Sequence, residues 1–166
     1  MKPHLLISTL ARPTRPALQG MTLLALSLFF CVSCRTQPFP PADLSSPGWR
    51  LRQGQAVWRP TRSRPELAGD LLLAVNSNGD FLVQFSKTPF ALASAQVTNG
   101  RWRIDLGQHS WRGRGTPPPR FAWFQLPQLL AGASAREPWS FTNRLDQTWR
   151  LENARTGETL EGQFFP

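Results

Sequence analysis

The chain has 166 residues, of which 19 are basic and 10 acidic, and its formal net charge at pH 7 is +9. This length corresponds to one domain, and a domain of this size can bury a hydrophobic core. Two cysteines and two histidines are too few for a thiolate metal site or a disulfide-rich scaffold, so packing must hold the fold together.

An apolar run, residues 21–32, ends in Ser33 and Cys34 and follows three basic residues. Those basic residues are Lys2, Arg12 and Arg15. The run has about a dozen residues, whereas a bilayer-spanning helix needs about 20. A positive start, a short apolar stretch and a small residue before a cysteine are typical of a bacterial lipoprotein signal peptide. We therefore expect residues 1–33 to be such a signal peptide and Cys34 to carry acyl chains such as palmitate.

Two other interpretations of this leader stay open, namely a plain secretory signal and an uncleaved membrane anchor. Cys31 occupies the place where a lipobox usually has leucine, and Met21 could be the true start of the chain. Arg35 follows the expected lipidation site, which by the usual sorting rule for Gram-negative lipoproteins favours the outer membrane. The predicted location is the outer membrane facing the periplasm, with the cell surface or secretion as alternatives.

Removal of the leader would leave Cys34 as the only cysteine and 16 basic against 10 acidic residues, a net charge of about +6. A basic excess in the envelope fits attraction to anionic lipid or lipopolysaccharide, whereas the compartment argues against nucleic acid as a partner. Residues 34–48 are rich in proline and serine and are predicted to carry the lipid and form a tether. A β-rich domain is predicted at residues 49–166.

Period-two alternation of apolar and polar side chains predicts the strands of this domain. The clearest strand, residues 101–106, has Trp102, Ile104 and Leu106 on one side. Two Asn-Gly pairs mark hairpin turns, because both residues tolerate positive φ. The strands predicted before residue 107 are 49–58, 67–75, 81–85, 90–97 and 101–106.

Residues 108–120 contain two glycines and three consecutive prolines and are predicted to be irregular. The following residues, 121–130, change to helical spacing, with Gly132 as a C-cap. Pro127 is compatible with a short helix that begins near Leu126 or with a kinked helix. Further strands are predicted at residues 139–145, 148–153 and 159–165.

This order of elements predicts a mainly β fold with one short helical insert, in which a curved antiparallel sheet forms a half-open β-barrel. The apolar face of the sheet must be covered by closure of the sheet, by the helix, or by a lipid-like ligand. All seven tryptophans lie after residue 48, and aromatic residues suit both a β-rich core and an apolar cavity. The candidates for lining a cavity, each with a plain core role as the alternative, are Phe81, Val83, Phe85, Trp102, Ile104, Trp123, Phe124 and Trp149.

The sequence offers no constellation typical of catalysis. His109 is the only histidine after the leader, and its neighbour Ser110 does not make it a catalytic dyad. The carboxylates are scattered, so no catalytic residue, metal or cofactor is predicted, and a hydrolase with two converging carboxylates is a minor alternative. Arg112, Arg114 and Arg120 are predicted to form a basic rim near a membrane or a partner, unless their loop is simply solvated.

Three segments share features with a known family. Residues 49–58 form a strand with an early tryptophan, residues 81–90 (FLVQFSKTPF) an aromatic hairpin followed by a Pro-apolar element, and residues 125–132 (QLPQLLAG) a Leu-Pro segment ending in glycine. In this order they resemble the LolA/LolB-like family of outer-membrane lipoprotein localisation factors, over most of residues 49–165. The resemblance implies a half-open barrel with an apolar cavity that accepts acyl chains, in which each buried methylene contributes about 0.8 kcal/mol.

The expected function is therefore that of a lipid-anchored periplasmic or outer-membrane protein that binds lipid or the acyl part of lipoproteins. Its partners would be the membrane, reached through the N-terminal lipid, the acyl chains themselves, and a periplasmic carrier protein. The alternative is a non-catalytic accessory lipoprotein that acts as a scaffold in an outer-membrane assembly.

Overall fold

The computed structural model describes residues 38–144 and 147–166. The expected signal peptide, the lipidation site Cys34 and the first part of the tether lie outside these residues. Phe39–Pro166 form one compact unit. In the described ranges no helix is long and apolar enough to cross a membrane.

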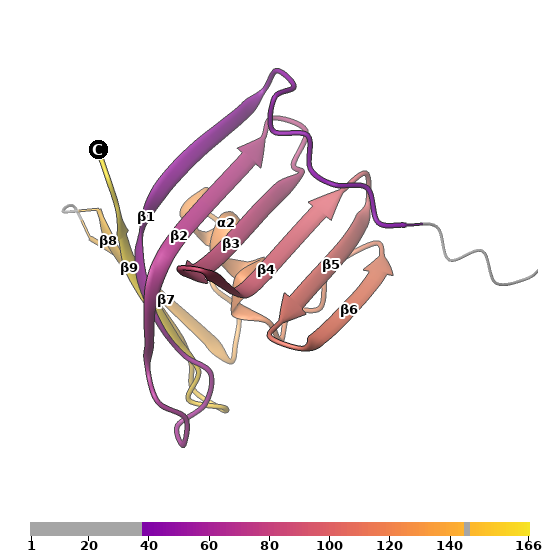
Figure 1. Ribbon diagram of the computed structural model, residues 1–166. Coiled ribbons are helices and arrows are strands. Elements are labelled where there is room, and N and C mark those ends of the chain that lie inside the picture. Colours follow the sequence, from indigo (N-terminus) through magenta and orange to yellow (C-terminus); the bar gives the residue numbers. More distant parts are fainter. Residues whose placement is uncertain (1–37, 145–146) are drawn as a thin grey trace, which may run out of the picture. The chain divides into compact units, whose positions relative to one another are not determined.

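Most of this unit is one antiparallel sheet of nine strands. The strand order is β6-β5-β4-β3-β2-β1-β9-β8-β7, so the sheet is open, with β6 and β7 at its two ends. Figure 1 shows the sheet curving around helix α2 (Ala122–Leu130). The prediction of a mainly β, antiparallel fold with one short helical insert is thus confirmed for the described residues. The strands are β1 (Trp49–Arg59), β2 (Leu67–Asn76), β3 (Phe81–Lys87), β4 (Phe90–Thr98), β5 (Arg101–Leu106), β6 (His109–Arg114), β7 (Trp139–Asn143), β8 (Thr148–Asn153) and β9 (Thr159–Phe164).

Alternation along the strands gives the sheet two different faces. Ile104 lies opposite Ala95, Ala95 opposite Val83, and Val83 opposite Leu73. All four are at most 3% exposed, and they belong to the face that α2 covers, which we call the core face. The opposite face carries the polar residues of the same strands, and we call it the outer face.

Strand β6 corrects one prediction. All eight strands expected from alternation are present, but His109–Arg114 add a further strand, where we predicted an irregular segment. Its alternation is weak because Trp111 is its only large apolar residue. Gly113 is there for space, since a side chain at that position would overlap the Trp102 indole on β5. Here a glycine makes room for a neighbouring ring rather than breaking the strand.

Helix α2 is held mainly by apolar packing. No side chain caps its N-terminus after Phe121, its first turn has no acidic residue, and its last turn has no basic one. Pro127 lies inside the helix, where it lacks the N–H that a helical hydrogen bond requires. Gly132, at φ +96°, follows the last turn as predicted, and its N–H donates to the Leu129 carbonyl at 3.0 Å. The buried helix residues are Ala122, Trp123, Phe124, Leu126, Pro127 and Leu129.

The segment before β1 is part of the compact unit. The Gln96 side-chain amide donates to the Pro40 carbonyl at 3.0 Å, and the Arg101 guanidinium lies 5.6 Å from the centre of the Phe39 ring. Further along, the Trp49 indole N–H donates to the Ser46 hydroxyl at 3.1 Å. Residues 39–48 therefore lie against the sheet over this part of the chain, and the compact unit begins ten residues before Trp49.

Candidate functional site

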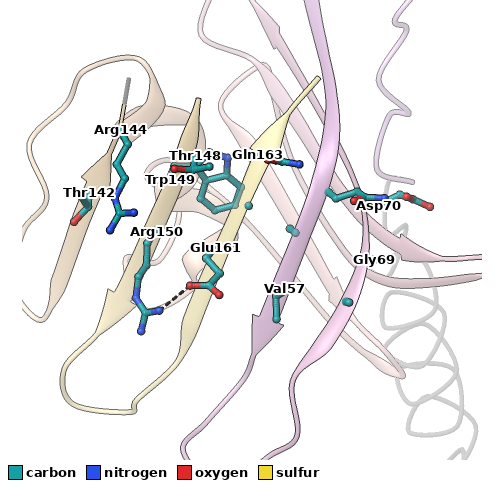
Figure 2. A pocket seen from close by; sticks show the side chains of 14 residues that line it. Val57, Gly69, Asp70, Thr142, Arg144, Thr148, Trp149, Arg150, Glu161 and Gln163 are labelled. Atoms are coloured by element: carbon teal, nitrogen blue, oxygen red, sulfur yellow. Dashed lines mark hydrogen bonds and ion pairs between the residues drawn. The ribbon is translucent and has the colours of Figure 1, made fainter. Parts of the chain in front are cut away.

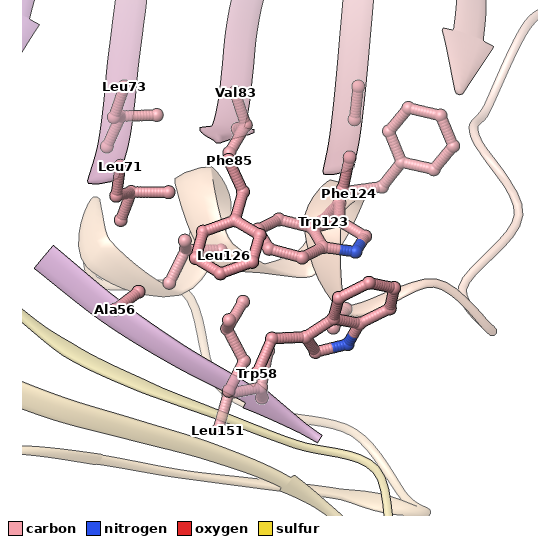
Figure 3. Packing of buried hydrophobic residues seen from close by; sticks show 14 of the residues in the cluster. Ala56, Trp58, Leu71, Leu73, Val83, Phe85, Trp123, Phe124, Leu126 and Leu151 are labelled. Carbon is pink, nitrogen blue, oxygen red and sulfur yellow. The ribbon is translucent and has the colours of Figure 1, made fainter. Parts of the chain in front are cut away.

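The residues predicted to line a cavity lie together on the core face and on α2. Seven of the eight are at most 5% exposed, and Trp102 is half-buried. Figure 3 shows Trp123 of α2 beside Trp58 and Phe85. The centre of its ring lies 5.2 Å from that of Trp58 and 5.4 Å from that of Phe85. In the described structure these side chains are packed against one another, so α2 fills the space that an apolar ligand would occupy.

Aromatic contacts also link Phe124 of α2 to strands β3 and β5. The Phe124 ring lies 5.8 Å from Trp102 and 6.3 Å from Phe81, both in edge-to-face geometry. Such pairs contribute about 0.5 to 1.5 kcal/mol each beyond the burial of their area. Ring contacts thus bind the helix to strands β1, β3 and β5.

Three buried indole N–H groups have no hydrogen-bond acceptor in the described structure. They belong to Trp102, Trp123 and Trp149, which are all among the cavity candidates. A buried donor without an acceptor costs about 1 to 3 kcal/mol. The core face therefore holds polar groups that its own side chains do not satisfy, and no pattern in the sequence predicts this.

Other tryptophans have acceptors. The indole N–H of Trp139 donates to the Pro119 carbonyl at 2.7 Å, and that of Trp58 donates to a Glu158 carboxylate oxygen at 3.0 Å. Burial raises the pKa of Glu158 to about 7, although the hydrogen bond from Trp58 opposes this effect. Glu158 lies in the turn between β8 and β9, and sequence reasoning treated it as one of several scattered carboxylates.

A groove of about 730 Å³ lies on the other side of the sheet, over β1, β2, β9, β8 and the β7–β8 hairpin. Figure 2 shows Arg144, Arg150, Glu161 and Asp70 around it. Sequence reasoning missed this groove because its residues come from both ends of the domain. Each of them, taken alone, has the pattern of an ordinary outward-facing strand residue.

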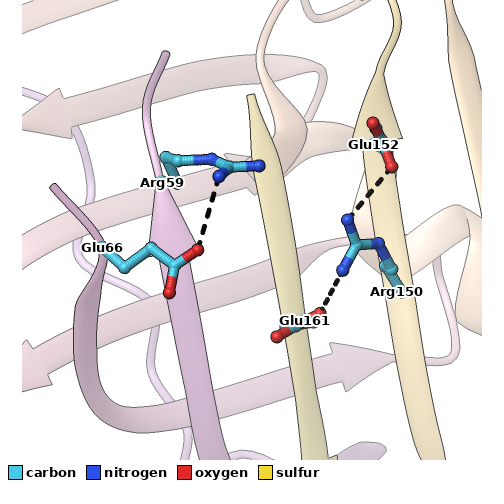
Figure 4. A network of polar contacts seen from close by, with 5 residues as sticks. All are labelled: Arg59, Glu66, Arg150, Glu152 and Glu161. Atoms are coloured by element: carbon cyan, nitrogen blue, oxygen red, sulfur yellow. Dashed lines mark hydrogen bonds and ion pairs between the residues drawn. The ribbon is translucent and has the colours of Figure 1, made fainter. Parts of the chain in front are cut away.

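Arg150 and Glu161, which both line this groove, form an ion pair on the outer face (Figure 4). Arg150 contacts Glu161 at 2.7 Å and Glu152 at 3.2 Å. The hydrogen bonds to Glu152 and then to Glu161 raise the pKa of Arg150. Because these side chains are about half exposed, the pairs contribute little to stability. The groove walls carry both signs of charge, which does not favour a strongly charged small ligand.

The three arginines of the predicted basic rim come from two parts of the fold: two lie on β6, and one precedes α2. Arg112 and Arg114 are exposed on the outer face of β6, where they lie opposite Arg103 and Arg101 of β5. The guanidinium of Arg120 instead lies 4.7 Å from the centre of the Phe121 ring, just before α2. The sequence did not predict the pairing with Arg101 and Arg103, because β6 itself was not predicted.

The described part of the chain shows no candidate metal centre. It contains no group of three or more His, Cys, Asp or Glu side chains placed to hold a metal ion. The His109 ring lies 5.7 Å from the Trp111 ring at the end of the sheet.

Comparison with known proteins gives no family assignment, because neither a protein-family model nor a curated protein matches the chain. What the structure defines is the class of fold: an open, curved antiparallel sheet with one helix packed on its core face.

Proposed function

We propose that this protein is a lipid-anchored envelope protein that binds the acyl chains of lipids or lipoproteins on the core face of its sheet, as the LolA/LolB-like resemblance implies. The observation that carries the proposal is that one short helix, α2, covers an aromatic face and has no side-chain cap at its N-terminus. In this proposal α2 acts as a displaceable cover, and Cys34 carries the lipid that holds the protein at the membrane.

The energies of cover and ligand are comparable. Burial of the four large α2 side chains contributes about 6 to 12 kcal/mol, at about 1.5 to 3 kcal/mol for each. A palmitoyl chain has about 14 methylenes, and their burial contributes about 11 kcal/mol. The burial of an acyl chain can therefore replace the free energy that the packing of α2 provides. A ligand with much less apolar surface could not.

The unpaired indoles support an acyl ligand over a pure hydrocarbon. A lipid or lipoprotein acyl chain ends in an ester or amide carbonyl, which accepts hydrogen bonds. We call the structure with α2 packed on the core face the closed arrangement. In it, the N–H groups of Trp102, Trp123 and Trp149 lack acceptors. A carbonyl that reached one of them would relieve part of the penalty of about 1 to 3 kcal/mol for a buried unpaired donor.

The transfer step needs no catalysis. Acyl chains would arrive from a periplasmic carrier protein and leave for the membrane, moving to the site of higher affinity at each step. Such a role fits a chain with a basic excess of charge, since anionic membrane surfaces attract basic proteins. It requires neither a metal nor a cofactor.

The test is uptake of palmitate by Phe39–Pro166, followed by native mass spectrometry. We expect a saturable complex with one or a few fatty acids. Trp102→Arg, which places a charge on the core face, should abolish the complex. Gln128→Arg, at an exposed position of α2, is the matched control and should leave it intact. Unfolding curves would show that both variants are folded.

A second candidate function is the accessory scaffold. The filled core face and the separate groove on the outer face favour it, because in this case α2 is a permanent part of the core. If the unsubstituted domain and both variants are well folded but take up no palmitate, the acyl-binding proposal is overturned. The scaffold is then the better explanation.

A further inference from the structure

Four arginines on the outer face of the β5–β6 hairpin form two cross-strand pairs. Arg101 lies directly opposite Arg114, and Arg103 directly opposite Arg112. We call these four residues the arginine patch. Like charges in directly opposite positions destabilise an antiparallel pair. Folding alone therefore does not favour this arrangement.

One carboxylate in the hairpin offsets part of this charge. Asp105 contacts Arg103 at 2.8 Å, which leaves a net charge of +3 on these five side chains. Arg103, Arg112 and Arg114 are exposed, so the patch is accessible to a large anionic partner. Guanidinium groups bind phosphate oxygens through charge-assisted hydrogen bonds.

The described chain begins beside this patch. Phe39 lies against Arg101, and the Pro40 carbonyl accepts a hydrogen bond from Gln96 on the neighbouring strand β4. Residues 39–48 follow the sheet from there to β1, so they do not act as a free spacer. Cys34 precedes Phe39 by five residues, and an extended chain of that length spans at most about 18 Å.

We propose that the arginine patch binds the anionic phospholipid headgroups of the membrane in which the N-terminal lipid is anchored, so that the β5–β6 end of the domain faces the bilayer. This inference rests on the proposed lipid anchor at Cys34. An anchor within about 18 Å of Phe39, which lies against Arg101, keeps the arginines close to the headgroups. Each basic side chain near an anionic bilayer strengthens binding about fivefold.

This orientation also places one edge of the core face close to the membrane, which supplies the lipid. Strand β6 is an end of the open sheet, and its Trp111 ring lies 5.5 Å from Phe121, the residue that precedes α2. A membrane at the β5–β6 hairpin would therefore lie next to the start of the helix that covers the core face.

The experiment uses Phe39–Pro166, the compact unit with its own core, and so measures the patch without any lipid anchor. Binding is followed by co-sedimentation with vesicles of phosphatidylcholine, alone or mixed with phosphatidylglycerol. We expect binding only to the anionic vesicles, and we expect salt to weaken it.

Two double variants with the same change in net charge decide the matter. Arg112→Gln with Arg114→Gln should weaken binding about 25-fold, from about fivefold for each arginine. Arg64→Gln with Arg155→Gln removes two exposed arginines from loops at the other end of the strands and should have a much smaller effect. Arg112→Lys with Arg114→Lys should retain most of the binding, which keeps the test valid if the glutamine variant is unstable.

Equal weakening by the patch and control variants would overturn the proposal, as would equally strong binding to neutral vesicles. The anchor is tested separately, by the intact mass of the full chain produced in a bacterium. Patch-dependent binding by a chain that carries no acyl group would support the arginine patch and overturn the lipid anchor. An acylated chain whose patch variants bind normally would do the reverse.

Discussion

Glu158 shows how one residue couples the aromatic core to solution pH. Its carboxylate accepts the Trp58 indole N–H at 3.0 Å. The turn that holds Glu158 is also bound by Arg62, which donates to the Ala154 carbonyl at 3.0 Å. Burial raises the pKa of Glu158 from 4.5 to about 7. Between these values the folded protein binds more protons than the unfolded chain, so the free energy of unfolding must fall as pH rises.

We predict that Glu158→Gln stabilises the protein at pH 8 and has little effect at pH 4. Glutamine keeps an acceptor for Trp58 but removes the buried charge, and a shift of this size corresponds to roughly 3 kcal/mol. Urea unfolding at both pH values measures the difference. The exposed Glu137→Gln serves as the control, and an equal gain for both variants at pH 8 would contradict the role of burial.

The indole groups of Trp139 and Trp149 allow a second comparison at this scale. Both side chains are nearly fully buried, but only Trp139 has an acceptor, the Pro119 carbonyl. We predict that Trp139→Phe destabilises the fold by about 0.5 to 1.5 kcal/mol more than Trp149→Phe, because only Trp139→Phe removes a hydrogen bond. Urea unfolding of the two variants tests this, and equal losses would mean that ring volume alone decides.

At the scale of elements, short sequence patterns predicted the strands and turns that depend mainly on neighbouring residues in the chain. Alternation located eight strands, and the turn at Asn99 and Gly100 has the positive φ values, 51° and 67°, that its sequence implied. Strand β6 was missed because its only large apolar residue is Trp111, and Gly113 has its role only beside Trp102. The same limit applies to the outer groove and the arginine patch, since both depend on which strands become neighbours.

Helix α2 is the element on which the acyl-binding proposal depends. Proline in a helix interior costs about 3 kcal/mol relative to alanine, although Pro127 recovers part of this through its buried ring. We predict that Pro127→Ala stabilises the closed arrangement by about 1 kcal/mol and weakens the uptake of palmitate. Unfolding and binding measured on the same variant test both effects.

Gln128→Ala is the control for that substitution, because Gln128 is exposed on the same helix. It should change helix propensity by a few tenths of a kcal/mol and leave uptake unchanged. If Pro127→Ala stabilises the protein but palmitate binds as before, α2 does not need to move for acyl chains to bind.

For the whole molecule, the central strands and helix α2 are held in different ways. Strands β1 and β2 have 11 and 10 residues and are hydrogen-bonded to neighbours on both sides. Helix α2 contacts the sheet through its apolar side chains. A ligand of the core face would compete with α2 for the same apolar surface, whereas the central strands are held by hydrogen bonds on both sides. Such a ligand should therefore displace α2 before it disturbs the central strands.

We therefore predict that saturating palmitate speeds hydrogen exchange of the α2 amides while those of β1 and β2 stay protected. Displacement of the helix breaks its packing and exposes its backbone, whereas the strand hydrogen bonds remain intact. Hydrogen exchange followed by mass spectrometry, with and without palmitate, resolves the two regions in one experiment. If α2 stays protected while the fatty acid is bound, the acyl chain occupies another surface, and the aromatic residues of the core face serve only the fold.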